Sequence, residues 1–117
     1  MSEVLEDMFQ YIEVDSDDMK FAKKLNLGKR IEILDLEPRA LDCLQQSDYK
    51  YIWQIYVFCS KDSLKDINNM GKKSAKDIVT KVKNVCRFDI VPDYDSRENL
   101  DEVESRLNLC RRLKLLH

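Results

Sequence analysis

The sequence predicts an all-α fold, a compact helix-hairpin-helix domain of about five short helices with additional N- and C-terminal helices. Apolar residues recur at helical spacing along most of the chain. The 117 residues include only two glycines and two prolines, too few for a turn-rich β fold. A tight turn containing Gly71 joins two short helical segments.

The N-terminal third predicts three helical segments. Residues 3–12 carry apolar side chains at helical spacing, which predicts a short amphipathic helix. Asp15 or Ser16 can cap a second helix that ends near Gly28. Residues 31–36 break the pattern, and Pro38 then stands where the first turn of a helix tolerates proline. The helix from Pro38 to about residue 46 is expected to bury Leu41 and Leu44.

Residues 50–59 are ambiguous, because their β-branched and aromatic content favours a strand. Ile52, Ile55, Tyr56 and Cys59 nevertheless follow the helical i, i+3, i+4, i+7 spacing, and no partner strand is visible. Two side chains of this segment, Trp53 and Phe58, fall outside that stripe and fit either a core or a partner surface.

The C-terminal half predicts two helices and a linker after the Gly71 turn. One helix runs from Lys72 to about residue 85, and residues 86–94 form a linker or an extended crossing. A final helix over about residues 96–116 has a broad apolar stripe. That stripe can dock on the core or pair with another chain, and docking is the expectation.

The turn at residues 69–74, Asn-Met-Gly-Lys-Lys-Ser, holds the chemistry that bears most directly on function. Gly71 can adopt a positive φ and lets a neighbouring group approach the backbone. The first turn of the following helix leaves N–H groups for an anion, beside Lys73 and Ser74. Upstream, Ser60 caps a short helix, so the pattern is helix, tight turn, helix. This is typical of a unit that grips a nucleic-acid phosphate, or of a plain helical hairpin with solvated lysines.

Residues 31–44, together with the later 69–74 turn, resemble the C-terminal domain of the bacterial RNA polymerase α subunit. The resemblance covers residues 31–86 and implies a helix over residues 50–59. We therefore predict three parts: an acidic helical extension (1–30), a unit like that C-terminal domain (31–86), and a linker with an amphipathic helix (87–117). The protein is expected to be a free-standing, cytoplasmic relative of that domain.

The resemblance implies that one arginine enters a DNA minor groove and that five further residues line the same surface. These site residues are Arg39, Cys43, Asn69, Gly71, Lys73 and Ser74. The function implied is a non-enzymatic, transcription-related module that contacts A·T-rich DNA, RNA polymerase or transcription factors, with no cofactor, metal or membrane. A helix-hairpin-helix accessory of DNA repair or recombination remains an alternative.

Two departures from the family pattern weaken the expected DNA contact. Asp42 replaces the usual asparagine, three residues after Arg39, where it can pair with the guanidinium and repel phosphate. Glu37 replaces the small hydroxyl residue that usually caps this helix. Residues 1–18 are acidic and the formal net charge is −2. These features favour the alternative of a protein-interaction module, or mimic, that has lost DNA binding.

The remaining polar residues give no catalytic or metal-binding pattern. The four cysteines are widely spaced, without a C-x-x-C pair, and the single histidine is the terminal His117. We therefore expect reduced, buried thiols and no enzymatic activity.

Overall fold

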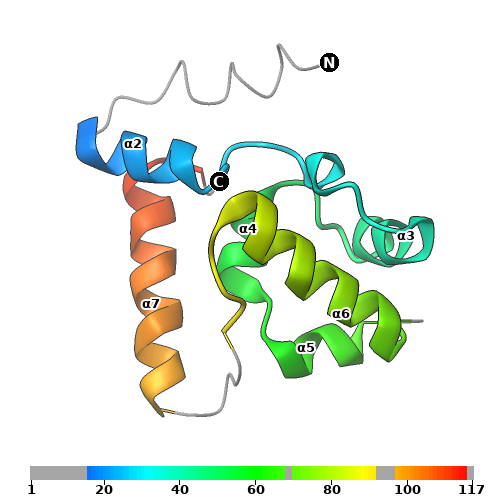
Figure 1. Ribbon diagram of the computed structural model, residues 1–117. Coiled ribbons are helices and arrows are strands. Elements are labelled where there is room, and N and C mark those ends of the chain that lie inside the picture. The colour runs from blue at the N-terminus through cyan, green and yellow to red at the C-terminus, as the bar shows by residue number, and fades with distance from the viewer. Residues whose placement is uncertain (1–15, 68–69, 92–96, 116–117) are drawn as a thin grey trace.

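The computed structural model describes residues 16–67, 70–91 and 97–115, and these residues form an all-α fold without strands (Figure 1). The predicted helix over residues 3–12 lies outside the described residues. No helix in the described ranges is both long and apolar enough to cross a bilayer. The elements are α2 (Ser16–Lys24), the 3-10 helix η1 (Ile31–Leu34), α3 (Pro38–Gln46), α4 (Ile52–Phe58), α5 (Lys61–Asp66), α6 (Lys72–Lys81), the π-helical turn η2 (Val82–Cys86) and α7 (Arg97–Arg112).

Residues 52–58 form the helix α4 because the turn that follows α2 satisfies its first backbone donors. The N–H of Ile52 donates to the carbonyl of Lys29 at 2.8 Å, and the N–H of Trp53 donates to that of Leu27 at 3.0 Å. These bonds satisfy two of the donors that a helix start leaves without an intrahelical partner. The helical prediction for this segment is therefore confirmed over its strand propensity.

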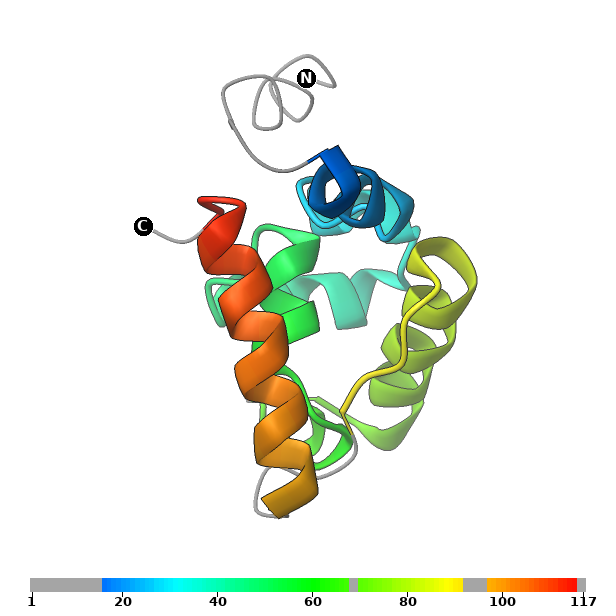
Figure 2. The same cartoon turned by 90° about the vertical axis from the view of Figure 1, so that its left-hand side faces the viewer.

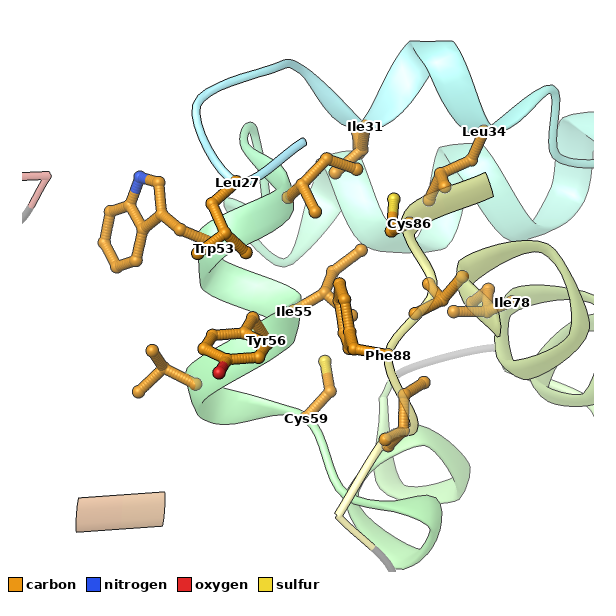
Figure 3. Close-up of a cluster of buried hydrophobic side chains, with 14 of the residues drawn as sticks. Leu27, Ile31, Leu34, Trp53, Ile55, Tyr56, Cys59, Ile78, Cys86 and Phe88 are labelled. Atoms are coloured by element: carbon orange, nitrogen blue, oxygen red, sulfur yellow. The ribbon is translucent and has the colours of Figure 1, made fainter. Parts of the chain in front are cut away.

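The two aromatic residues outside the α4 stripe lie in different environments. Trp53 is 8% exposed and belongs to the core, whereas Phe58 is 42% exposed. Their rings meet edge to face, with centroids 6.1 Å apart. The Trp53 indole points away from Ile55 and Phe88, at the margin of the cluster in Figure 3.

The ends of two helices differ from the sequence expectation. After α2 the left-handed residue is Asn26, with φ of 58°, and no glycine in the described residues has a positive φ. Asparagine tolerates this conformation, and here its Nδ2 also donates to the carbonyl of Val85 at 3.2 Å. The predicted helix over residues 72–85 continues beyond Lys81 as the π-helical turn η2, which ends at the left-handed Arg87.

One hydrophobic core joins the helices, including α2 near one end of the described residues and α7 near the other. α7 lies against α4, on the side of the molecule away from α3 (Figures 1 and 2). The predicted docking of the last helix is thus confirmed. The largest fully buried side chains are Leu27, Ile31, Leu34, Leu44, Ile52, Ile55, Leu64, Ile78, Leu113, Leu115, Val57 and Val82.

Arg106 of α7 ties three parts of this fold together while being only 8% exposed. Its guanidinium donates to the backbone carbonyl of Tyr56 at 3.1 Å and to that of Asp89 at 2.9 Å. It also pairs with Glu102 at 3.1 Å and stacks over the Tyr56 ring, 4.5 Å from the centroid. Tyr56 in turn packs edge to face on Phe88, 4.9 Å away (Figure 3). Arg106 therefore holds α7, α4 and the extended segment after η2 in one arrangement.

All four cysteines are buried as free thiols, as expected. Burial raises the pKa of Cys59, Cys86 and Cys110 to about 12. These thiols therefore stay protonated at neutral pH, which makes them poor nucleophiles.

We expect Arg106→Ala to lower the free energy of unfolding by about 2–4 kcal/mol, because the buried carbonyl of Tyr56 and the half-buried carbonyl of Asp89 lose their donor and a stacked side chain is removed. Arg112→Ala is the matched control on the same helix. The Arg112 side chain is 61% exposed and pairs with Asp18 at 3.1 Å, so its loss should cost no more than about 1 kcal/mol. Urea unfolding followed by circular dichroism measures both losses, and equal losses would contradict the role of Arg106 in joining α7 to α4.

The buried thiols predict a loss of stability in alkali. Unfolded thiols ionise near pH 9, whereas the three native thiols hold their protons to about pH 12. The unfolded chain therefore binds fewer protons in this window, and the free energy of unfolding should fall as pH rises from 9 toward 12. Below pH 9 the stability that the three protonated thiols contribute should be fully present.

Burial of the three thiols also predicts their reactivity. Thiol labelling followed by mass spectrometry should be slow in the native protein and rapid in urea. Rapid native labelling of any of the three would refute their burial.

Candidate nucleic-acid interface

A pocket of about 440 Å³ opens between the start of α3 and the start of α6. The two helices pack against each other, which brings together residues more than thirty positions apart in the sequence (Figure 1). The pocket is lined by Glu37, Pro38, Arg39, Gly71, Lys73 and Ser74. Four of the six predicted site residues (Arg39, Gly71, Lys73 and Ser74) therefore surround one concave surface.

Two cationic side chains stand at the pocket. Arg39 follows Pro38 in the first turn of α3, and Lys73 is the second residue of α6. Both side chains are exposed. Because the N–H groups of a first helical turn have no intrahelical acceptor, the start of α6 adds partial positive charge beside Lys73.

Gly71 precedes α6 in an extended conformation, with φ of −84° and ψ of 167°. The positive φ considered possible from the sequence is therefore not used. A Cβ built at this position would meet nothing within 4 Å. The glycine is not required by packing, and the backbone at the pocket is open to an approaching group.

Ser74 differs most from its predicted role, because its hydroxyl is already engaged. The residue is 2% exposed, and its Oγ donates a hydrogen bond to Oε1 of Glu37. The backbone N–H of Glu37 donates in turn to Oδ2 of Asp77 at 3.0 Å. The start of α3 is thus bonded to α6 at two points, and a carboxylate lies on the pocket wall.

The other predicted site residues lie outside this pocket or outside the described residues. Cys43 is 3% exposed and packs in the core. Asn69 lies outside the described residues. Asp42 accepts a hydrogen bond from Nε2 of Gln46 at 2.9 Å, and no ion pair joins it to Arg39, both being described residues.

The sequence does not predict Asp77 as the acceptor at the start of α3. The Glu37 side chain makes no capping hydrogen bond to α3, as expected for a glutamate at this position. Instead, the backbone N–H of Glu37 donates to the carboxylate of Asp77, forty residues away in the sequence. No local pattern announces such a contact, because it depends on how α3 and α6 pack. Within the described ranges, no group of three or more His, Cys, Asp or Glu side chains is placed to hold a metal ion.

More than half of the chain matches a known protein family. A family model for the C-terminal domain of the alpha chain of bacterial RNA polymerase matches residues 17–84. The match starts within α2, ahead of residue 31 where the predicted domain began, and it spans both walls of the pocket.

Several curated RNA polymerase α subunits resemble part of this protein. That of Helicobacter hepaticus is 39% identical over 56 residues, which are 48% of this chain and 16% of the subunit. That of Helicobacter pylori is 35% identical over 60 residues, 51% of this chain and 17% of the subunit. The subunit of a Nitratiruptor species is 38% identical over 52 residues, 44% and 16% of the two chains. The chain thus spans about a sixth of the length of these relatives.

The fold is also similar to a solved structure. The NMR structure of the C-terminal domain of the RNA polymerase alpha subunit from Helicobacter pylori matches with a TM-score of 0.59 at 30% identity. The match includes 89% of this chain and 79% of that one, so the shared fold extends beyond the residues matched by the family model.

Proposed function

Since this chain belongs to the family of C-terminal domains of the bacterial RNA polymerase α chain, we propose that it is a non-enzymatic transcription module that binds A·T-rich DNA through the pocket between α3 and α6. One observation carries the proposal. Exposed Arg39 and Lys73, from two different helices, meet at a single pocket whose third side is the open backbone of Gly71.

The geometry suggests a role for each group. The Arg39 guanidinium enters the minor groove, whose negative potential is enhanced where A·T pairs make it narrow. Lys73 and the first-turn N–H groups of α6 bind the adjacent backbone phosphate. Gly71 lets that phosphate approach, since no side chain stands in its way. Such contacts position the protein and read groove shape more than base identity.

The affinity should be low and should fall further as salt is added. The protein has a formal net charge of −2, and a Glu37 carboxylate lies on the pocket wall. Few phosphates are contacted, so the dependence of log K on log salt should have a shallow slope.

A second candidate function is a protein-interaction module that has lost DNA binding and contacts RNA polymerase or transcription factors. The engagement of the Ser74 hydroxyl by Glu37 favours it, because that hydroxyl is then not offered to a phosphate. Absence of duplex binding at low salt by the wild type would favour this second function.

Arg39→Ala should weaken binding to an A·T-rich duplex by about 1–3 kcal/mol, because it removes the group that enters the groove. Fluorescence anisotropy at low salt measures the dissociation constant. Arg111→Ala is the matched control, since Arg111 is an exposed arginine of α7 and does not line the pocket. It changes the net charge equally and should alter binding by only about twofold, a long-range effect that salt screens.

The two variants separate a specific contact from general attraction. Circular dichroism establishes that both are folded. Equal effects of Arg39→Ala and Arg111→Ala would mean that only net charge matters, and the proposed pocket would then not be the DNA site.

A further inference from the structure

Glu37 holds a group that the proposed DNA contact needs. Ser74 is a buried residue, and its hydroxyl donates its one proton to the Glu37 carboxylate and cannot donate it to a phosphate oxygen at the same time. Ser74 is the third residue of α6, so its hydroxyl lies beside the first-turn N–H groups.

The position of Glu37 is fixed from both of its ends. Its backbone N–H is bonded to Asp77 of α6 at 3.0 Å, while its side chain reaches Ser74 of the same helix. These bonds hold the carboxylate on the pocket wall, near the place where a phosphate would approach Lys73 and Gly71. A carboxylate there presents its oxygens to the hydroxyl much as a phosphate would.

We propose that Glu37 is an internal competitor for the anion site. Its carboxylate accepts the hydrogen bond of the Ser74 hydroxyl in place of a phosphate. Nucleic acid therefore makes all of its contacts only in molecules in which this hydrogen bond is broken. The inference rests on the proposed function and identifies Glu37 as the residue that limits the affinity for nucleic acid. Since only the released fraction of molecules is competent, the apparent dissociation constant rises in inverse proportion to that fraction.

Three variants separate this role from simple charge repulsion. Glu37→Ser removes the carboxylate and restores a small hydroxyl at the start of α3. Glu37→Gln removes the charge and keeps an oxygen that can still accept from Ser74. Asp42→Asn is the matched control, because Asp42 is another acidic residue of the same region whose side chain does not line the pocket.

The variants are compared for binding to an A·T-rich duplex by fluorescence anisotropy. Glu37→Ser should tighten binding by about tenfold, the scale of one charge-assisted hydrogen bond. Glu37→Gln should give a smaller gain, and Asp42→Asn about twofold. Adding Ser74→Ala to Glu37→Ser should remove most of the gain, because the released hydroxyl is then missing. A gain for Glu37→Ser no larger than that for Asp42→Asn would overturn the competitor role.

Inorganic phosphate gives a second probe that does not depend on DNA. Phosphate is titrated into the wild type and the Glu37→Ser variant while NMR follows the backbone amides of residues 71–76. Tighter phosphate binding by the variant supports the competitor role, even if no form binds duplex, in which case the proposed DNA function falls alone. Equal phosphate binding by the two proteins would overturn the competitor role. The spectra also establish that each variant is folded.

Discussion

The junction between the starts of α3 and α6 is the constraint on which the candidate site depends. Two hydrogen bonds cross it, from the Glu37 N–H to Asp77 and from the Ser74 hydroxyl to Glu37. They hold the start of α3 against the first two turns of α6, and this packing brings Arg39 and Lys73 to one pocket. The same bonds place a carboxylate where an anion is expected to bind. Glu37 therefore helps to assemble the pocket and also opposes anion binding there.

Buried side chains of the hydrophobic core hold the two helices of that junction in place. α6 is anchored through Ile78 and the η2 turn that follows it through Val82, both fully buried, and α3 is anchored through Leu44. On the far side, Arg106 joins α7 to α4 and to the extended segment after η2. Because α7 lies away from α3 (Figures 1 and 2), its charges can be altered without touching the pocket. This separation makes stability and binding testable independently.

Local signals in the sequence predicted much of the fold. The proline at position 38 and the apolar spacing after it predicted α3 with the bounds that the structure has, and Ser60 caps α5 as expected. Two other features could not be predicted from the sequence. The π-helical turn at the end of α6 has no simple sequence signature. The pairing of Ser74 with Glu37 needs the packed structure, because local patterns do not report contacts 37 residues apart. The motif therefore predicted a phosphate contact for Ser74, whereas the packing of α3 against α6 gives it Glu37 as its partner.

The most direct test of this account is to map the DNA contact on the intact protein by NMR. An A·T-rich duplex is titrated into the labelled protein at low salt, and the shifts of the backbone amides are followed. The largest shifts should fall at the starts of α3 and α6, among residues 37–41 and 71–76, and they should diminish as salt is raised. Shifts confined to α7 and α4, or the absence of any shift at low salt, would contradict DNA binding at this pocket.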